Sequence, residues 1–276
     1  MPRFQPEFDR YKHHRDAADA IVMATGIKFR LAAPPSAPSL FPLYPRFINP
    51  HLLNYCMIDF NKMIDRFLFR EQSPKQAGRY YPSEIGSCLR KVWYSYRFPQ
   101  SVQPRLLKIF ELGNILHDFV VKVMQSEKNS EVELLQFEVP IKLEVEDFVI
   151  SGRIDDLLLL KANGKQLLVE VKSCKAVSFV REAQPHHAMQ LQFYMHATGV
   201  HDGILLYIDR STLESKVFTI PYNPVRASEI ILRFKTLHTA LAQSILPMAE
   251  AKFNPHMSWM CKFCEYKEKC DKNSKE

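Results

Sequence analysis

The residues of this sequence whose spacing most plainly suggests chemistry lie in two apolar runs that are interrupted by charges. Residues 151–175 read SGRIDDLLLLKANGKQLLVEVKSCK. Asn163-Gly164 between the two runs predicts a β-hairpin with a two-residue type I′ turn, because that turn needs a positive φ at both central residues. In this hairpin Asp155 would lie directly opposite Lys172.

Side chains alternate along a strand, so this register places Asp155, Glu170 and Lys172 on one face of the sheet and Asp156 on the other. Asp155 and Glu170 are then diagonal neighbours, roughly 7 to 8 Å apart, and a hard divalent cation can bridge their carboxylates. The cation would activate a water for attack on a phosphodiester, and Lys172 would hold that water or neutralise the transition state. The alternative is an ordinary hairpin with solvated charges, which the interruption of a buried apolar run disfavours.

Two predicted helices would complete this site. His117 follows Gly113 by four residues in ELGNILHDFVVKVM, and its neutral imidazole is a suitable third metal ligand. Gln190 and Tyr194 are four residues apart and therefore share one helical face. Each feature also has a simpler explanation, since a lone helical histidine and a pair at this spacing are most often part of ordinary packing.

The sequence contains six cysteines, at positions 56, 88, 174, 261, 264 and 270. A chain of 276 residues without an export signal is an unusual place for a disulfide framework, so metal ligation is the better interpretation. Cys261, Cys264 and Cys270 have the spacing C-x2-C-x5-C and need a fourth ligand. Cys88 is the best candidate, because it stands at a predicted helix start, where the helix dipole favours a thiolate.

An iron-sulfur cluster and a four-cysteine zinc site are the alternatives for these thiols. Zinc sites of this type usually combine two closely paired knuckles, whereas here one cysteine is distant in sequence. Cluster ligation tolerates irregular spacing better, so we favour iron. Cys56 and Cys174 would remain as free thiols.

Composition indicates a globular protein with an anionic partner. The hydrophobic content of 46% allows a sizeable core, and 37 basic against 30 acidic residues give a net charge of +7. This surplus is weak support for nucleic acid binding. No apolar run approaches the roughly 20 residues that span a bilayer, and the first residues lack the apolar region of a secretory signal. We therefore expect a cytoplasmic protein with no membrane partner.

Hydrophobic periodicity predicts the elements that position these residues. Six prolines within residues 34–50 predict an extended connector, so we divide the chain into an N-terminal extension, 1–50, and a main domain, 51–276. Strands flanked by helices indicate a mixed α/β sandwich. Predicted helices cover residues 51–72, 88–97, 106–125, 183–198 and 225–250, and predicted strands cover 133–142, 148–160, 166–173, 203–209 and 215–220.

These segments together resemble the RecB-like branch of the PD-(D/E)XK nuclease superfamily, and most closely the CRISPR-associated iron-sulfur exonuclease family. The likeness covers about residues 57–276. It rests on five matches in the family's order, closed by the three terminal cysteines: SEIGSC with Cys88, the helix from Gly113 to His117, GRID at 152–155, EVK at 170–172, and Gln190 to Tyr194.

The resemblance implies an α/β fold with a PD-(D/E)XK core, in which helices flank a central mixed sheet and a C-terminal region binds an iron-sulfur cluster. It implies a Mg²⁺ or Mn²⁺ site with a catalytic lysine, formed by His117, Asp155, Glu170, the backbone carbonyl of Val171, and Lys172. It also implies that Gln190 and Tyr194 position the DNA. The implied ligands of a [4Fe-4S] cluster are Cys88, Cys261, Cys264 and Cys270.

Members of this family act on single-stranded DNA ends, often 5′ to 3′, and trim CRISPR spacer precursors beside the integrase. The resemblance therefore implies a metal-dependent exonuclease on single-stranded DNA, with the spacer integrase complex as a partner in a CRISPR setting. The alternative is a non-catalytic iron-sulfur DNA-binding subunit of a repair or integration complex. The presence of all the metal ligands favours the enzyme. Arg90, Lys91 and Tyr94, which combine charge with an aromatic ring near Cys88, are the predicted strand contacts.

Overall fold

A computed structural model of the protein describes residues 58–71 and 73–273. The predicted N-terminal extension, residues 1–50, and Cys56 lie outside the described residues. The helices are α2 (Phe60–Leu68), α3 (Leu89–Arg97), α4 (Pro104–Met124), α5 (Pro185–Thr198), α6 (Pro224–Ala242), α7 (Glu250–Phe253), α8 (Trp259–Lys262) and α9 (Lys267–Lys272). The strands are β1 (Arg79–Tyr80), β2 (Val132–Val145), β3 (Phe148–Leu160), β4 (Lys165–Cys174), β5 (Asp202–Asp209) and β6 (Ser215–Pro221), and two short 3-10 turns are η3 (Pro82–Glu84) and η4 (Val177–Phe179).

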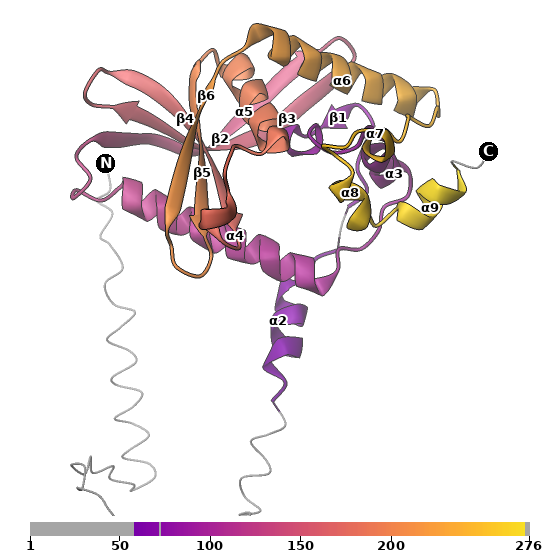
Figure 1. The fold of residues 1–276 in the computed structure, drawn as a ribbon, viewed down its shortest axis with the longest axis horizontal. Helices are drawn as coiled ribbons and strands as arrows, with labels where there is room; N and C mark the ends of the chain where they lie inside the picture. Colours follow the sequence, from indigo (N-terminus) through magenta and orange to yellow (C-terminus); the bar gives the residue numbers. More distant parts are fainter. Residues whose placement is uncertain (1–57, 72, 274–276) are drawn as a thin grey trace, which may run out of the picture. The chain divides into compact units, whose positions relative to one another are not determined.

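The strands form one mixed six-stranded sheet (Figure 1). The long strand β3 is its centre, pairing antiparallel with β2 and β4 and parallel with β1. Beyond β4 the sheet continues through the parallel strand β5 to the antiparallel strand β6. The prediction of an α/β fold with a central mixed sheet flanked by helices is confirmed.

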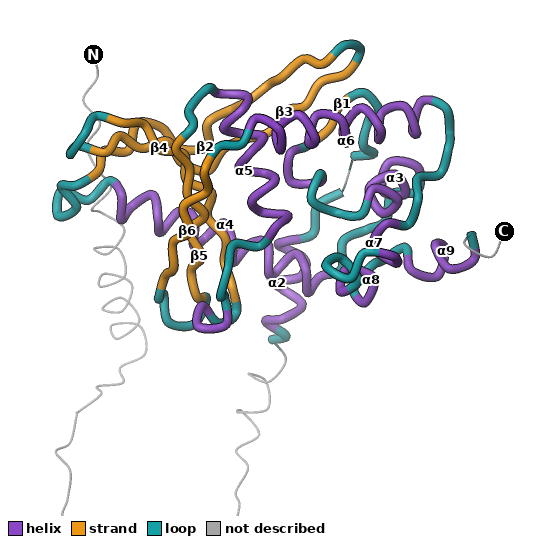
Figure 2. Tube along the Cα trace, turned by 45° about the horizontal axis from the view of Figure 1, so that its top comes forward, coloured by secondary structure: helices purple, strands orange, loops and turns teal. Residues whose placement is uncertain are grey.

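Helices cover both faces of this sheet (Figure 2). Side-chain alternation along β5 divides the core between the two faces. Leu205 packs in the larger core with Leu191 of α5 and with residues of α6. On the other face Ile208 packs with Leu116 and Val120 of α4. Helices α4 and α5 therefore lie on opposite faces of the sheet. No helix in the described part of the chain is long and apolar enough to cross a membrane.

Helix α6 ends earlier than the sequence predicts. Its start is capped by Asn223, whose side chain accepts hydrogen bonds from the backbone N–H groups of Val225 and Arg226. Its last residue is Ala242, eight residues before the predicted end at 250. Ser244 has a φ of 57°, which a continuing α-helix does not allow, and Pro247 follows. After this early helix end, the chain continues toward the short helices that carry the C-terminal cysteines.

The hairpin turn between β3 and β4 differs from the predicted one. The loop has four residues, and Leu160 pairs with Lys165, so the register is two residues away from the predicted pairing. Gly164 has a φ of 68°, and its N–H donates to the Leu160 carbonyl at 2.8 Å, whereas Asn163 does not adopt a positive φ. A type I′ turn is therefore not formed. Because the shift is an even number of residues, the side chains keep their predicted faces.

Candidate active site

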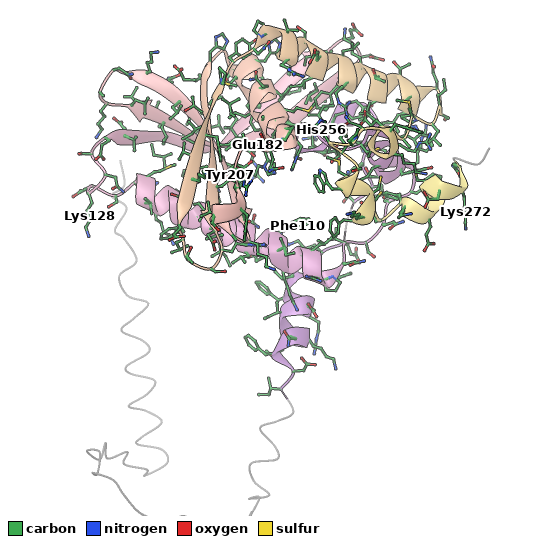
Figure 3. All side chains as sticks on the ribbon, in the orientation of Figure 1. Phe110, Lys128, Glu182, Tyr207, His256 and Lys272 are labelled. Carbon is green, nitrogen blue, oxygen red and sulfur yellow. The ribbon has the colours of Figure 1, made fainter. Side chains whose placement is uncertain are left out.

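A cleft of about 1170 Å³ opens between α4, α5 and the strands β3 and β4. Phe110 of α4 also faces it (Figure 3). The structure brings together in this cleft the seven residues that sequence reasoning and the resemblance assigned to metal binding, catalysis and DNA positioning near the hairpin: His117, Asp155, Glu170, Val171, Lys172, Gln190 and Tyr194.

Asp155 lies where β3 and β4 separate. The antiparallel ladder ends at the pair Asp156 and Val169, and one step further the N–H of Val171 donates to Asp155 Oδ2 at 2.7 Å. Asp155 and Glu170 are thus opposite one another rather than diagonal, which corrects the predicted arrangement by the same two-residue shift. Burial raises the pKa of the Asp155 carboxyl, while the charge of Lys172 opposes that rise.

Glu170 is 1% exposed, and its two carboxylate oxygens differ in their partners. Oε1 accepts a hydrogen bond from Lys172 Nζ at 2.5 Å, whereas Oε2 is buried without a donor among the described residues. Burial, helped by the nearby charge of Asp155, raises the pKa of Glu170 to about 8. An unpaired buried carboxylate oxygen is unfavourable unless a cation satisfies it.

The donors of the cleft therefore fit a hard divalent cation, since two carboxylates with an unsatisfied oxygen converge there. They do not form a finished ligand set. No group of three or more His, Cys, Asp or Glu side chains within residues 58–71 and 73–273 is arranged so that it could hold a metal ion. The residues that would have to move together to complete a ligand set all line this one cleft.

His117 is oriented by a residue that sequence reasoning placed outside the site. Its Nε2 lies 3.4 Å from Oδ2 of Asp156, which is fully buried. The interaction with this carboxylate raises the pKa of His117 to about 9, against the opposing effect of burial. His117 would have to lose its proton to bind a metal. As predicted, Asp156 points away from the sheet face that carries Glu170. It nevertheless contacts the site, because its carboxylate lies beside the His117 ring.

Lys172 is held by a chain of hydrogen bonds from α5. Lys172 Nζ donates to Gln190 Oε1 at 3.2 Å, Gln190 Nε2 donates to Tyr194 Oη at 3.0 Å, and Tyr194 Oη donates to the Arg153 carbonyl at 2.7 Å. Gln190 and Tyr194 are 8% and 2% exposed. In this structure they orient the lysine, and their burial leaves little surface for the direct DNA positioning that the resemblance implies.

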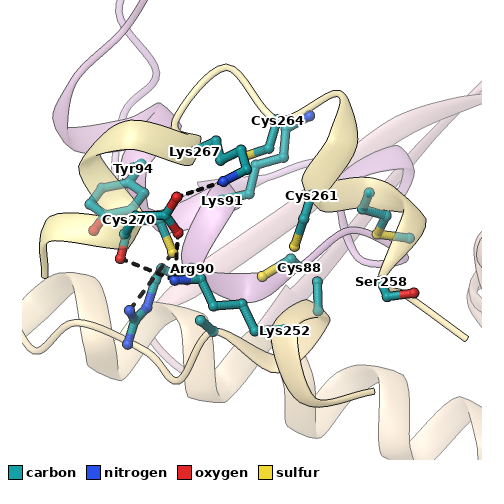
Figure 4. Close-up of a pocket in the computed structure, with 14 residues that line it drawn as sticks. Cys88, Arg90, Lys91, Tyr94, Lys252, Ser258, Cys261, Cys264, Lys267 and Cys270 are labelled. Atoms are coloured by element: carbon teal, nitrogen blue, oxygen red, sulfur yellow. Dashed lines mark hydrogen bonds and ion pairs between the residues drawn. The ribbon is translucent and has the colours of Figure 1, made fainter. Parts of the chain in front are cut away.

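A second cavity, of about 240 Å³, is lined by all four predicted cluster cysteines. Cys88 is the N-cap residue of α3, and Cys261, Cys264 and Cys270 come from the segment of α8 and α9. Figure 4 shows the Cys88 and Cys261 sulfur atoms close to one another. Burial raises the pKa values of Cys261 and Cys264, and the Cys88 thiol adds to both shifts. The four thiols share one cavity but are not arranged as a metal site in this part of the chain.

The family model of the PD-(D/E)XK nuclease superfamily matches residues 68–271, about three quarters of the chain. The chain belongs to this superfamily. PD-(D/E)XK nucleases use divalent metal ions such as Mg²⁺, in agreement with the donors of the carboxylate cleft. The match does not distinguish the CRISPR-associated iron-sulfur subfamily.

Solved structures resemble this PD-(D/E)XK chain only moderately. One, described as SSO0001, is 21% identical, covers 75% of this chain and 92% of its own, and has a TM-score of 0.49. The alkaline exonuclease LHK-Exo from Laribacter hongkongensis is 13% identical, with coverages of 61% and 90% and a TM-score of 0.42. A phage related exonuclease from Haemophilus somnus is also 13% identical, with coverages of 57% and 80% and a TM-score of 0.41. A search of curated proteins finds no match.

The predicted strand contacts Arg90, Lys91 and Tyr94 do not face the cleft of this PD-(D/E)XK domain. They line the cysteine cavity (Figure 4). Tyr94 is 1% exposed, so its ring cannot stack on a base. Arg90 Nη1 donates to Cys270 Sγ at 3.8 Å, and Lys91 Nζ lies 3.1 Å from Glu265 Oε2. These residues surround the thiols because Cys88 begins the helix that carries them, and we withdraw them as DNA contacts.

Sequence reasoning missed a polar clamp that joins the Cys88 loop to the C-terminal segment. Arg233 of α6 donates to both carboxylate oxygens of Glu250, at 2.8 and 2.9 Å, and also to the carbonyls of Ile85 and Ser87. Glu250 Oε1 in turn accepts the N–H of Leu89, the first residue of α3, at 2.8 Å. No sequence signal marks these partners, because they are distant along the chain.

Proposed function

We propose that this chain is a divalent-metal-dependent DNA nuclease that degrades single-stranded DNA from an end, 5′ to 3′. The observation that carries the proposal is the buried pair Asp155 and Glu170 with Lys172 bonded to it, in a cleft large enough for a nucleic acid strand. A buried carboxylate with one unsatisfied oxygen has no evident structural use, whereas it suits a Mg²⁺ or Mn²⁺ site.

His117, Asp155, Glu170 and the carbonyl of Val171 would hold the metal. When bound, a divalent cation lowers the pKa of a water and stabilises charge on a phosphodiester. Lys172 places a positive charge at the cleft floor, where it can neutralise the negative charge that develops on the phosphate. Gln190 keeps the lysine ammonium from turning away, because its amide oxygen accepts one of the ammonium protons.

The walls of the cleft support a single-stranded nucleic acid as substrate. Arg79, Lys142 and Arg153 line it and can neutralise phosphates. Phe110 lines it as well and is 56% exposed, so its ring is accessible to a base that is not stacked in a duplex.

We further propose that Cys88, Cys261, Cys264 and Cys270 bind a [4Fe-4S] cluster with a structural role. The support is their common cavity, which none of the residues that line the carboxylate cleft also lines. In a CRISPR setting the nuclease would trim DNA for the spacer integrase complex; in a repair setting it would act on damaged ends. A cytoplasmic location accords with either setting.

Cleavage of labelled oligonucleotides tests the main proposal. Linear single strands labelled at the 5′ or the 3′ end, a circular single strand and a blunt duplex are incubated with Mg²⁺ or Mn²⁺. We expect linear single strands to be shortened from the 5′ end, while the circle and the duplex persist and Lys172→Met is inactive. DNA binding by wild-type protein without any cleavage, in either metal, would instead support the non-catalytic DNA-binding subunit.

A further inference from the structure

We propose that His187 is a phosphate-binding residue of the cleft, a neutral imidazole whose Nε2–H donates to a non-bridging oxygen of the DNA strand beside Lys172. This inference rests on the proposed nuclease function and adds a residue that neither the hairpin nor the resemblance identified. His187 is the third residue of α5, and it lines the same cleft as Lys172 and Gln190.

The hydrogen bonds of Tyr207 decide which nitrogen of His187 carries the proton. The backbone N–H of Gln184 donates to Tyr207 Oη at 3.0 Å, and the same oxygen lies 2.9 Å from His187 Nδ1. Tyr207 is 2% exposed, and His187 is the acceptor available to its hydroxyl proton among the described residues. The hydroxyl therefore donates to Nδ1, and in a neutral ring the proton must then be on Nε2.

The charge state of His187 agrees with this assignment. Burial, together with the positive charge of Lys172 and the neighbouring His186, lowers the pKa of His187 to about 2. The ring is therefore neutral at any working pH. The only hydrogen bond of the His187 ring to the described residues is the one at Nδ1, and His187 lines the cleft, so its Nε2–H is available to an acceptor bound there. A phosphate oxygen is an acceptor of the right charge, next to the ammonium of Lys172.

The first turn of α5 is held rigidly, as a positioning role requires. Gly86 packs directly on His186, and a Cβ added to Gly86 would lie 2.5 Å from His186 Cβ and 2.7 Å from its Cα. The His186 ring also contacts Trp259 of α8, with ring centroids 5.6 Å apart. The loop that leads to Cys88 and the segment that carries the other cysteines thus both brace the turn that carries His187.

Binding of a single-stranded oligonucleotide, measured with Ca²⁺ in place of the catalytic metal, tests the proposal. The oligonucleotide is used unmodified and with one methylphosphonate moved along it, which removes the charge of one phosphate at a time. We expect His187→Phe to weaken binding of the unmodified strand by about tenfold, the scale of one hydrogen bond to a charged group. We also expect one methylphosphonate position that weakens binding to the wild type and not to His187→Phe.

His196→Phe is the matched control, because His196 also lies on α5 with its Nδ1 3.0 Å from a tyrosine hydroxyl, that of Tyr222, but does not line the cleft. His196→Phe should bind the unmodified oligonucleotide and each methylphosphonate oligonucleotide with the affinity of the wild type. A second measurement does not depend on any variant folding: ¹⁵N NMR of the wild type should show His187 with its proton on Nε2 and no titration down to pH 5.

Three results overturn the inference. They are an Nδ1-protonated or charged His187, unchanged binding in a folded His187→Phe protein, and a methylphosphonate profile that is the same in the wild type and the variant. In each of these the wild type still binds and cleaves DNA, so the proposed function stands. A wild type that neither binds nor cleaves single-stranded DNA overturns the proposed function and this inference together.

Discussion

The carboxylate cleft and the cysteine cavity are both lined by residues that could bind metal, but they are built in different ways. The cleft residues Asp155, Glu170 and Lys172 sit on adjacent strands, and hydrogen bonds already connect them to the backbone and to α5. Cys88 stands at the start of α3, and the other three cysteines lie in the segment of the short helices α8 and α9. An ion pair between Arg233 and Glu250 joins the loop before α3 to the segment that precedes these helices.

Because they are built differently, the two sites should depend on their bound metals in different ways. Strand pairing holds the two carboxyl groups together even though burial raises the pKa of both, so the fold places these oxygen donors side by side before any cation arrives. The cavity has no strand framework. Its C-terminal cysteines lie on or beside short helices, which contribute little structure by themselves, and the hydrogen bonds of Arg233 and Glu250 join the Cys88 loop to the segment before them. We therefore expect the ligand of the cleft to supply reactivity, and the ligand of the cavity to supply stability.

The largest expected effect separates activity from stability in the cleft. Asp155→Asn, Glu170→Gln and Lys172→Met should each reduce cleavage of single-stranded DNA on the order of 10³-fold, because each removes charge at the reacting phosphate. In the absence of metal the melting temperatures of Asp155→Asn and Glu170→Gln should not fall, because each replaces a buried carboxyl group by a neutral amide of the same shape. Lys172→Met should unfold at a lower temperature, because it leaves Glu170 Oε1 and Gln190 Oε1 without their donor. Initial rates and thermal unfolding check both parts. A variant with full activity would remove its residue from the site, and a lower melting temperature of either carboxyl variant would assign that residue a structural role.

In the cysteine cavity we expect the next largest effect, which should fall on stability and not on the chemistry of cleavage. Cys88→Ala should lower the melting temperature and the iron content, because a cluster on Cys88 and Cys261 closes a very long loop and loop closure contributes roughly 4 to 5 kcal/mol. Cys174→Ala is the control, since Cys174 is a free thiol that does not line the cavity. Iron analysis of anaerobically purified protein should give about four iron atoms per chain. A colourless preparation with one zinc, or unchanged iron in Cys88→Ala, would contradict the cluster.

A smaller effect tests the interaction between buried Asp156 and His117 of the cleft. Its carboxylate raises the pKa of His117 to about 9, so in the metal-free protein Asp156→Asn should lower that pKa toward the ordinary 6.5. The pair stabilises the fold fully below about pH 6.5, and the stabilisation is lost as the pH rises through about 9. The variant should be about 1 to 3 kcal/mol less stable at pH 6, with a smaller difference at pH 9.5. If NMR shows the same His117 pKa in the variant and the wild type, Asp156 does not set the pKa of His117.

Much of the cleft could be predicted from the sequence because strand alternation is a local rule. The two-residue error in the hairpin register left Asp155, Glu170 and Lys172 on the expected face. The turn itself could not be predicted, because Asn163-Gly164 is compatible with several loops and the longer one left only Gly164 with a positive φ. Periodicity predicted the long strands and helices, but α6 ends early, and within the described residues the predicted helix 51–72 is helical only over α2 (Phe60–Leu68). The short strand β1 and the short helices α7, α8 and α9 were not predicted.

The remainder depended on contacts between distant segments. The burial of Tyr94 follows from packing against Tyr266, whose ring centroid is 5.5 Å away and which lies far along the chain. A mixture of charge and aromatic residues looks the same in sequence whether it faces solvent or core. The bond between His187 and Tyr207 likewise joins α5 to β5, and no local pattern announces it.

Calorimetric titration of Mn²⁺ into protein that has been freed of divalent cations but retains its iron-sulfur cluster tests the metal site of the cleft most directly. Mn²⁺ prefers oxygen donors over thiolates, so the titration reports on the cleft and not on the cysteine cavity. We expect a Mn²⁺ site in the wild type and in Cys174→Ala, and a Mn²⁺ affinity at least tenfold weaker in Glu170→Gln. Equal Mn²⁺ affinity in the wild type and in a folded Glu170→Gln protein would contradict this expectation.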